Sequence, residues 1–307
     1  MLITVLLAVY NGEKYLRQQI DSLLAQTIKE FKILIRDDGS SDSSSQIIDE
    51  YCAKFPQQIS KICGKPTGSA AQNFAQLLNA CDSDYIAFCD QDDVWLPQKL
   101  EKTLDAMKRT EAQGLNIPVL VHSDLKVVNQ NLEVISPSFF KFQRLPQDRL
   151  TLSKLLVQNY ITGCTVMINR ALKDLCGKIP PECIMHDWWL ALTASFFGKI
   201  VCVNESLILY RQHADNQVGA KAAYGIKLLK RKFTTRDTVK KNYDSTYVQA
   251  KALLDCYGSK IDKTQAQIVG VYASMKDKNK FQKLKLINKY GFKKSPILRL
   301  IGQYFLM

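Results

Sequence analysis

The stretch YIAFCDQDDVWLP, residues 85–97, decides the fold, because it joins a short apolar run to three closely spaced acids. The run has the length of a strand, and Asp90, Asp92 and Asp93 follow it within four positions. Like charges so close raise each other's pKa unless a positive group lies among them. A divalent cation is the simplest compensation. The stretch therefore predicts a buried strand that ends at a metal site.

The residues on either side of this stretch alternate between strand and helix with short connections. Continuous apolar runs indicate strands that are covered on both faces, and apolar residues at helical spacing indicate amphipathic helices. This order predicts an α/β fold with a doubly wound, mostly parallel sheet. The predicted strands are residues 2–9, 31–38, 59–63 and 84–90, and the predicted helices are residues 13–26, 44–55, 70–81 and 97–109.

After Ile117 the rhythm changes. Paired strands are expected at 119–129 and 132–136, a strand at 164–169 and one or two strands at 200–211; helices are expected at 152–159 and 187–198. Beyond Gly219 the pattern is helical, basic and amphipathic. We therefore expect one domain over 1–220, divided near residue 117, and a basic helical C-terminal region over 221–307.

Charge separates these two regions. The chain has 42 Lys+Arg and 29 Asp+Glu, a net charge of +13. Residues 221–307 hold 20 Lys+Arg against 5 Asp+Glu, so the first 220 residues carry 22 against 24. A basic tail suits nucleic acid in general, but it contains no recognisable nucleic-acid motif, so no specific nucleic-acid partner is predicted.

Length and composition favour an ordinary globular protein with 46% apolar residues in 307. No run reaches the ~18 apolar residues of a spanning helix. The apolar N-terminus lacks a basic leader and a cleavage site, so it is interpreted as a first strand and not a signal peptide. Nine cysteines without a CxxC pair indicate reduced thiols in a cytoplasmic protein and argue against zinc.

Unusual residues follow three of the predicted strands: AVYNG after the first, RDDGSSD after the second and CDQDD after the fourth. In open α/β sheets, ligands bind at the carboxyl ends of the strands. A GxGxxG after the first strand and a GxxxxGK[ST] are both missing, which argues against a dinucleotide fold and a P-loop.

These motifs together resemble glycosyltransferase family 2 of the GT-A fold, in particular its bacterial rhamnosyltransferase-like branch. The resemblance rests on VLLAVYNGEKYL, FKILIRDDGSSD, CDQDDVWLPQKL, MHDWWLAL and YRQHADNQVG, and covers roughly the first 220 residues. It implies a nucleotide-sugar half over 1–117 and an acceptor half over 118–220.

The resemblance implies a donor site in the first half. Tyr10 would pack on the nucleotide base beside Ala8, and Asp38 would accept a hydrogen bond from a pyrimidine N3–H. Asp90 would lie near the ribose or the metal, and Asp92 on the metal. Mg²⁺ or Mn²⁺ prefers oxygen ligands and is commonly shared between carboxylates and substrate phosphates. The cation would neutralise charge that develops on the departing nucleoside diphosphate.

Further donor contacts are implied at the edges of this site. Lys65 and Asn73 follow the third strand and would approach the donor. His213 of YRQH would complete the metal shell or touch the diphosphate. Arg211 would bind a phosphate, since a guanidinium suits that geometry.

On the acceptor side, Asp187 of MHDWW lies where the family places its catalytic base. A hydroxyl that attacks the anomeric carbon must lose its proton, and a carboxylate can take it. One base and in-line attack give inversion. The residues expected to border the acceptor are Thr162, Gly163, Trp188 and Trp189, the tryptophans by stacking on sugar.

Each assignment has a structural alternative. Asp187 and Asp93 could cap helices, and Asp42 is interpreted as an N-cap or turn residue. Tyr10 and the two tryptophans could belong to the core. His213 could be a hydrogen-bonded structural histidine.

The leading hypothesis is an inverting, metal-dependent glycosyltransferase that moves a sugar from a nucleoside diphosphate to a saccharide or lipid-linked glycan in cell-surface polysaccharide synthesis. The branch suggests L-rhamnose from dTDP-L-rhamnose; a UDP-hexose or UDP-N-acetylhexosamine donor is the alternative. A nucleotidyltransferase shares the sheet and the acidic site, but usually opens with a Gly-rich basic loop that AVYNGEKY lacks. A non-catalytic sugar- or nucleic-acid-binding protein is suggested only by the tail.

The tail leaves two interpretations open. Its segments at 226–233 and 281–307 interleave Lys and Arg with large apolar residues, which suits an anionic membrane surface. The alternative is a solvated helical bundle packed on the domain. The membrane interpretation places the protein in the cytoplasm, peripheral at the inner face of the cell membrane.

Overall fold

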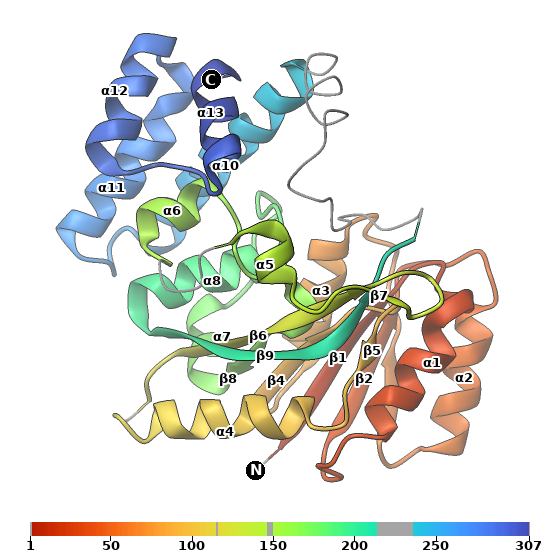
Figure 1. Cartoon of the computed structure of the whole chain (residues 1–307). Coiled ribbons are helices and arrows are strands. Elements are labelled where there is room, and N and C mark those ends of the chain that lie inside the picture. The colour runs from red at the N-terminus through yellow and green to blue at the C-terminus, as the bar shows by residue number, and fades with distance from the viewer. Residues whose placement is uncertain (1, 115, 146–149, 214–235, 307) are drawn as a thin grey trace.

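A central sheet organises the part of the chain that the computed structural model describes, residues 2–114, 116–145, 150–213 and 236–306 (Figure 1). The sheet has nine strands in the order β3-β2-β1-β4-β8-β6-β9-β5, with β7 beside β6. The strands are β1 (Ile3–Val9), β2 (Lys32–Asp37), β3 (Ile59–Ile62), β4 (Tyr85–Cys89), β5 (Val94–Trp95), β6 (Val119–Val128), β7 (Val134–Ser136), β8 (Met167–Asn169) and β9 (Lys199–Arg211).

Strands β3, β2, β1 and β4 are parallel neighbours, which confirms the predicted α/β sheet. Side chains alternate across β1: Val5 and Leu7 enter one apolar core and Leu6 enters the other. Helices α1 (Glu13–Leu24), α2 (Ser44–Lys54) and α4 (Lys99–Glu111) supply the first core, and α3 (Ala70–Ala80) supplies the second. Burial on both faces explains why the strands are continuous apolar runs.

The second half of the sheet is mixed. Strand β8 runs antiparallel to both β4 and β6, whereas the long β9 is parallel to β6 and antiparallel to β5. The strand predicted at 164–169 is shorter than expected, because Gly163–Thr165 forms a 3-10 turn (η1) before it. The Thr165 hydroxyl and amide both donate to the carbonyl of Thr162 there, which favours the turn over an extended strand.

Between these strands along the chain come helices α5 (Phe139–Gln143), α6 (Leu152–Val157), α7 (Arg170–Cys176) and α8 (His186–Phe197). The described part of the C-terminal region, residues 236–306, contains α10 (Arg236–Tyr257), α11 (Lys263–Ala273), α12 (Lys280–Tyr290) and α13 (Ile297–Leu306), with a 3-10 turn η2 (Ser274–Asp277). None of the helices within the described ranges is both long and apolar enough to cross a bilayer.

The C-terminal helices share an apolar core with α6 and α8. The rings of Trp189 and Tyr257 lie 6.0 Å apart, and the amide of Ile184 donates to Oε1 of Gln249 at 2.9 Å. The helical region therefore packs on the domain, as one of the two interpretations expected. The expected boundary at residue 220 and the basic segment 226–233 lie outside the described residues.

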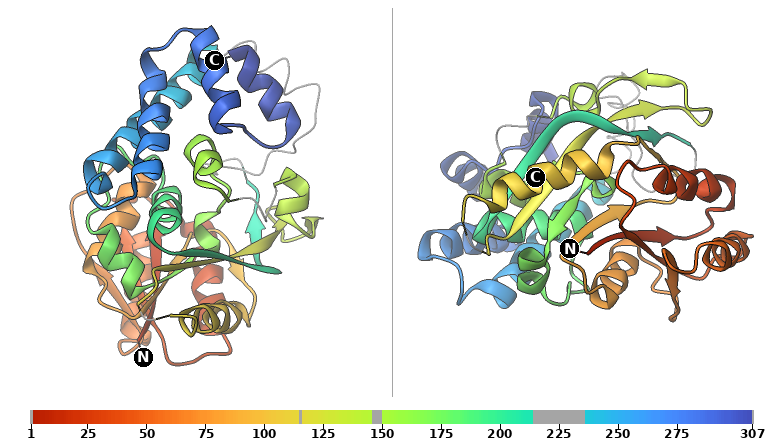
Figure 2. Two further views of the ribbon diagram at one scale, coloured as in Figure 1. Left: turned by 90° about the vertical axis from the view of Figure 1, so that its left-hand side faces the viewer. Right: turned by 90° about the horizontal axis from the view of Figure 1, so that it is seen from below.

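The two ends of the chain mark two ends of the molecule. In Figure 1 and the left view of Figure 2, the N-terminus lies at the bottom and the C-terminal helices at the top. Strand β1 starts beside the N-terminus, so β1 and its parallel neighbours present their carboxyl ends toward the upper half of the molecule.

Candidate functional site

The loop after β1 is tied to the loop after β4 by one side chain. The amide of Tyr10 donates to Oε1 of Gln91 at 2.7 Å, and Nε2 of Gln91 donates back to the carbonyl of Tyr10 at 2.8 Å. A Cβ on Gly12 would lie 2.6 Å from this Oε1, so a glycine leaves room for the bridge. Sequence reasoning missed Gln91, because its partner is a backbone group 81 positions away.

The loop after β2 is tied to the loop after β1. The amide of Asn11 donates to Oγ of Ser40 at 2.8 Å, and the amide of Ser41 donates to Oδ1 of Asn11 at 2.8 Å. Asp42 accepts from the amides of Glu13 and Ser44 at 3.0 Å each, which confirms it as a turn residue. These bonds hold the carboxyl ends of β1 and β2 together.

Asp38 lies at this edge in a dense set of donors. Its carboxylate accepts from NH1 of Arg36 at 2.7 Å, from the amide of Thr67 at 2.7 Å and from the amide of Gly68 at 2.9 Å. Burial by itself raises the pKa of Asp38, but these hydrogen bonds outweigh it and the pKa lies below its ordinary value. Asp38 is therefore an ionised carboxylate in a rigid setting.

Arg36 is a residue that the sequence analysis missed, although the RDDG motif contains it. Its buried guanidinium also donates to Oδ1 of Asn73 at 2.8 Å and to the carbonyl of Lys65 at 2.7 Å. Asn73 is itself buried, so it holds Arg36 in place beneath the loop. In the structure Asn73 acts on Arg36, and its expected contact with the donor stays a prediction. Lys65 is exposed at the same loop.

Tyr10 and Ala8 occupy the end of β1. The Tyr10 side chain is 54% exposed, so the core alternative for it is wrong. Ala8 is half-buried. The exposed aromatic ring follows directly after β1, where a planar base could stack.

The three acids after β4 have three different surroundings. Oδ2 of Asp92 lies 2.7 Å from Nε2 of His213, so the YRQH segment does reach the acidic stretch. Burial, followed by the charges of Asp92 and Asp187, raises the pKa of the half-buried Asp90 to about 7. Asp93 is fully buried, and its Oδ1 accepts from the amide of Arg211 at 3.1 Å.

These surroundings fit a divalent cation beside Asp90. One ligand atom each from Asp90, Asp93 and Cys164 lies within 4.8 Å of the others. Burial, followed by the charges of Asp93 and Asp90, raises the pKa of the Cys164 thiol well above its usual value, so it is a poor ligand for Mg²⁺ or Mn²⁺. The carboxylate oxygens of Asp90 and Asp92 suit these cations better, and His213 lies beside Asp92.

Arg211 does not point into this site. Its guanidinium donates to the carbonyls of Asp92 and Gln130 at 2.8 and 2.6 Å and to Oε1 of Gln18 at 2.5 Å. It also stacks over the Tyr15 ring, 4.4 Å from the centroid. The expected phosphate contact finds no support, because the side chain is buried and its donors hold β9 against α1 and the acidic loop.

Asp187 lies in the first turn of α8, whose capping position is Met185, so the N-cap alternative for Asp187 is wrong. Burial raises the pKa of Asp187 to about 7, although hydrogen bonds from the Trp188 amide, the Asn159 side chain and the Gly163 amide act in the opposite direction. The Trp188 amide lies 2.6 Å from Oδ1. Asn159 is a third residue that sequence reasoning missed. A Cβ on Gly163 would lie 3.4 Å from Oδ2 of Asp187, and the next residue, Cys164, has its ligand atom within 4.8 Å of Asp90 and Asp93, so Asp187 lies beside the acidic stretch.

The expected acceptor residues divide into two groups. Gly163 lies against Asp187, since a Cβ there would be 3.4 Å from Oδ2, and Thr162 beside it is half-buried. Trp189 is fully buried in the core, and Nε1 of the buried Trp188 donates to the carbonyl of Leu155 at 2.6 Å. Helix α8 turns both rings toward α6 and the C-terminal helices, which favours the core alternative, and their stacking on the acceptor stays a prediction.

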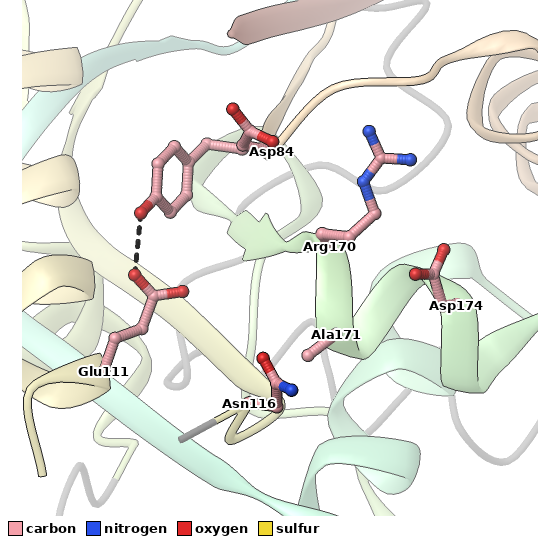
Figure 3. Close-up of a pocket in the computed structure, with 7 residues that line it drawn as sticks. Asp84, Glu111, Asn116, Arg170, Ala171 and Asp174 are labelled. Carbon is pink, nitrogen blue, oxygen red and sulfur yellow. Dashed lines mark hydrogen bonds between the residues drawn. The ribbon is translucent and has the colours of Figure 1, made fainter. Parts of the chain in front are cut away.

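A cavity of about 490 Å³ lies elsewhere in the molecule (Figure 3). It is lined by Asp84, Tyr85, Glu111, Asn116, Arg170, Ala171 and Asp174. Tyr85 begins β4, whereas the acidic stretch follows the last residue of that strand. The cavity is therefore at the opposite edge of the sheet, and the hydroxyl of Tyr85 is bonded to Glu111 there at 2.7 Å.

Residues 4–176 match the family model described as glycosyl transferase family 2, and the chain belongs to this family. The dTDP-rhamnosyl transferase RfbG of Shigella flexneri is 28% identical over 243 residues, which cover 72% of this chain and 76% of that protein. An uncharacterized glycosyltransferase of Nostoc is 29% identical over 235 residues, covering 73% and 69%.

An uncharacterized protein of Mycobacterium tuberculosis is 29% identical over 211 residues, which cover 67% of this chain. The matched part spans 57% of that mycobacterial relative's own length.

Solved structures confirm the GT-A fold. Staphylococcus aureus TarS (residues 1–349) superposes with a TM-score of 0.59 at 18% identity, over 94% of this chain and 80% of that one. The mannosyltransferase PcManGT of Pyrobaculum calidifontis, in complex with GDP-Man and Mn²⁺, gives a TM-score of 0.58 at 13% identity, over 98% and 78%. TarS has also been solved with UDP-GlcNAc, with a TM-score of 0.55 at 16% identity, over 94% and 89%.

Proposed function

We propose that this protein is an inverting, metal-dependent glycosyltransferase that moves a sugar from a nucleoside diphosphate to a hydroxyl group. The observation that carries the proposal is the placement of Asp187 against Gly163, the residue before Cys164, whose ligand atom lies within 4.8 Å of Asp90 and Asp93. A candidate base thus lies beside a candidate cation site, at the sheet edge where α/β proteins bind ligands. Family membership supports the same activity.

The donor would bind across the ends of β1, β2 and β4. Tyr10 offers an exposed ring for the base, and the ionised Asp38 can accept from a pyrimidine N3–H. Asp90, Asp92 and His213 would hold Mg²⁺ or Mn²⁺. When bound, the cation neutralises charge on the diphosphate leaving group. Arg36 fixes Asp38, so this side needs little rearrangement on binding.

Asp187 would take the proton of the attacking acceptor hydroxyl. A pKa raised to about 7 suits this role, because a general base works best when its pKa is near the operating pH. Asn159 and the Gly163 amide orient the carboxylate. Thr162 would border the acceptor on the same side. With a single base on the face opposite the leaving group, the anomeric carbon would be inverted.

The sugar we propose is L-rhamnose from dTDP-L-rhamnose. The support is the relative named dTDP-rhamnosyl transferase, which aligns over 72% of this chain. A UDP-hexose or a UDP-N-acetylhexosamine is the second candidate, since a protein of the same fold has been solved with UDP-GlcNAc.

For the acceptor we propose a saccharide or lipid-linked glycan used in cell-surface polysaccharide synthesis. The protein would act in the cytoplasm, peripheral at the inner face of the membrane. The basic C-terminal region supports this location, because each basic residue near an anionic surface adds ~1 kcal/mol of attraction.

A donor panel tests the proposal. Purified protein with Mn²⁺ or Mg²⁺ is incubated with dTDP-L-rhamnose, UDP-glucose, UDP-galactose, UDP-GlcNAc and GDP-mannose, and the released nucleoside diphosphate is measured. We expect slow release from dTDP-L-rhamnose that stops when the metal is chelated. Release from a UDP-sugar alone would contradict the rhamnose assignment, and release of pyrophosphate would indicate a nucleotidyltransferase instead.

One substitution with a matched control tests the proposed cation site. Asp92→Asn should abolish metal-dependent donor binding, measured by calorimetry with dTDP-L-rhamnose and Mn²⁺. Asp105→Asn, a change on the exposed side of α4, is the matched control and should bind the donor like the wild type. Unchanged donor binding by the Asp92 variant would contradict the proposed cation site.

A further inference from the structure

Helix α13 has its polar and apolar faces reversed relative to an ordinary surface helix. Gln303 is fully buried; its Nε2 donates to the carbonyl of Phe292 at 2.7 Å, and its Oε1 accepts from the amide of Lys294 at 3.0 Å. Arg299 also faces the protein and donates to Oε1 of Gln143 at 2.6 Å. A surface helix of a globular protein normally buries its apolar stripe and exposes its polar one.

Four apolar residues of α13 face outward, while Leu300 and Tyr304 are half-buried. Ile297, Ile301 and Phe305 recur every four positions, and Leu298 adds a neighbour three positions before Ile301, so they form one stripe along the helix. All four are exposed, Ile297 at 68% and Phe305 at 72%. Exposed apolar residues scattered singly need no explanation, but a contiguous stripe does.

Helix α12 extends this stripe into a larger patch. The hydroxyl of Tyr304 donates to Oδ1 of Asn288 at 2.7 Å, so the two helices lie side by side. Nζ of Lys280 donates to the carbonyl of Phe305 at 3.3 Å, which places the start of α12 at the end of α13. Phe281, 80% exposed, follows Lys280. We call these five residues the α12–α13 patch: Phe281, Ile297, Leu298, Ile301 and Phe305.

This patch holds five of the nine large apolar side chains that are exposed in the described part of the chain. Its surroundings are basic: residues 274–307 contain nine Lys+Arg and one acidic residue. On α12, Lys285 and Lys289 continue the four-residue spacing that starts at Phe281, and both are exposed. An apolar stripe with a basic border is the composition of a helix that lies in the interface of an anionic membrane.

We propose that the α12–α13 patch is a membrane-docking surface that inserts its apolar residues among the lipids of an anionic bilayer, while the lysines beside it contact the headgroups. Charge complementarity selects an anionic bilayer over a second copy of this chain, because two copies would bring like-charged lysine rows together. The inference deepens the location given in the proposed function and rests on it for its biological meaning. It rests on no step of sugar transfer.

Docking through this patch would also orient the candidate active site. The C-terminal helices lie at the end of the molecule toward which the parallel strands run (Figure 1 and the left view of Figure 2). The carboxyl edge of the sheet, with Asp92 and Asp187, therefore belongs to the membrane-facing half. A lipid-linked acceptor could enter from that side.

Vesicle flotation of the full chain tests the proposal, with vesicles of phosphatidylcholine alone or mixed with phosphatidylglycerol. We expect binding to the anionic vesicles at low salt that weakens at high salt. Ile301→Ser/Phe305→Ser should lower partitioning about tenfold or more, because two apolar side chains no longer insert. Lys285→Gln/Lys289→Gln should lower it about fivefold for each lysine removed.

The matched control is Val134→Ser/Ile135→Ser, which removes two similarly exposed apolar residues from β7, at 58% and 53% exposure. It should float like the wild type. Equal partitioning of the patch and control variants, or failure of the wild type to bind anionic vesicles, would overturn the proposal. A concentration-dependent dimer in sedimentation that only the patch variant disrupts, without lipid binding, would overturn it in favour of self-association. Since flotation measures no sugar transfer, an inactive protein that still floats would contradict the proposed function alone.

Discussion

Two carboxylates on opposite sides of the candidate site show how one fold can treat the same group in opposite ways. Asp38 accepts from a guanidinium and two backbone amides, and its pKa lies below the ordinary value. Asp187 is buried too but accepts only from uncharged amides, and burial raises its pKa to about 7. Environments that give two carboxylates such different pKa values assign them different chemical roles. The donor side is built to hold a fixed charge and the acceptor side to exchange a proton.

The largest expected effect is on the rate of transfer, when the proposed proton acceptor Asp187 is removed. Asp187→Asn should lower the rate of transfer by about 10²–10⁴-fold, the usual contribution of a general base, and leave donor affinity unchanged. Single-turnover transfer and donor titration measure the two effects separately. Asp105→Asn again serves as the control. Near-normal turnover of the Asp187 variant would mean that the base lies elsewhere.

Removing Arg36, the cation that pairs with Asp38, should mainly lower the stability of the protein. Arg36→Met leaves Asp38 buried without its cation, and removing one partner of a buried pair costs about 3 kcal/mol or more. Chemical denaturation should show this loss in the free energy of unfolding, together with weaker donor binding. Arg17→Met, which removes a solvent-exposed partner of Glu50, is the control and should change stability by less than about 1 kcal/mol. Equal losses in the two variants would argue against the positioning role of Arg36.

The acceptor side should be the pH-sensitive one. Because Asp187 accepts a proton only when ionised, the transfer rate should rise about tenfold per pH unit below about 7 and level off above it. Saturating Mn²⁺ during the measurement keeps the acidic pair ionised. Asp38, with its lowered pKa, should add no step in this range. A rate that stays flat from pH 5 to 8 would contradict the assignment.

The same raised pKa has a consequence for stability. The folded protein holds the proton of Asp187 up to about pH 7, whereas an unfolded chain releases it near 3.8. Because the folded state keeps a proton that the unfolded state has released, the free energy of unfolding falls progressively as the pH rises from about 4 to about 7. Asp187→Asn should remove this loss, so the gap in melting temperature between variant and wild type should grow from pH 4 to pH 7. A constant gap would indicate a different origin.

The smallest expected effect concerns the bridge between the strand ends. Gly12→Ala places a Cβ 2.6 Å from Oε1 of Gln91, so the amide must move away from the Tyr10 backbone. We expect a loss of about 1 kcal/mol in the free energy of unfolding. A double-mutant cycle with Gln91→Ala measures the coupling. In the Gln91→Ala background, Gly12→Ala should cost little further stability, because the side chain that it displaces is gone. Additive losses would contradict the bridge.

Much of the fold followed from local patterns. The apolar runs at β1, β2 and β4 and the helical spacing between them predicted the parallel half of the sheet, because both faces of such a strand must be covered by helices. The placement of acids directly after the strand at 85–89 predicted which edge would carry the site. The sequence alone did not predict that β8 would enter the sheet between β4 and β6, since strand order depends on long-range pairing.

What the sequence by itself determined was therefore the class of fold, the acidic edge and the residues that gather there. Tertiary structure decided the rest. Arginine often binds phosphate and tryptophan often stacks on sugar, yet the side chains of Arg211 and of the two tryptophans are packed inside the protein. Arg36, Gln91 and Asn159 act through partners far away in the chain or through backbone groups, which no local motif records. The residue type determines the chemistry of a side chain, but the neighbours that the folded chain brings to it determine its orientation.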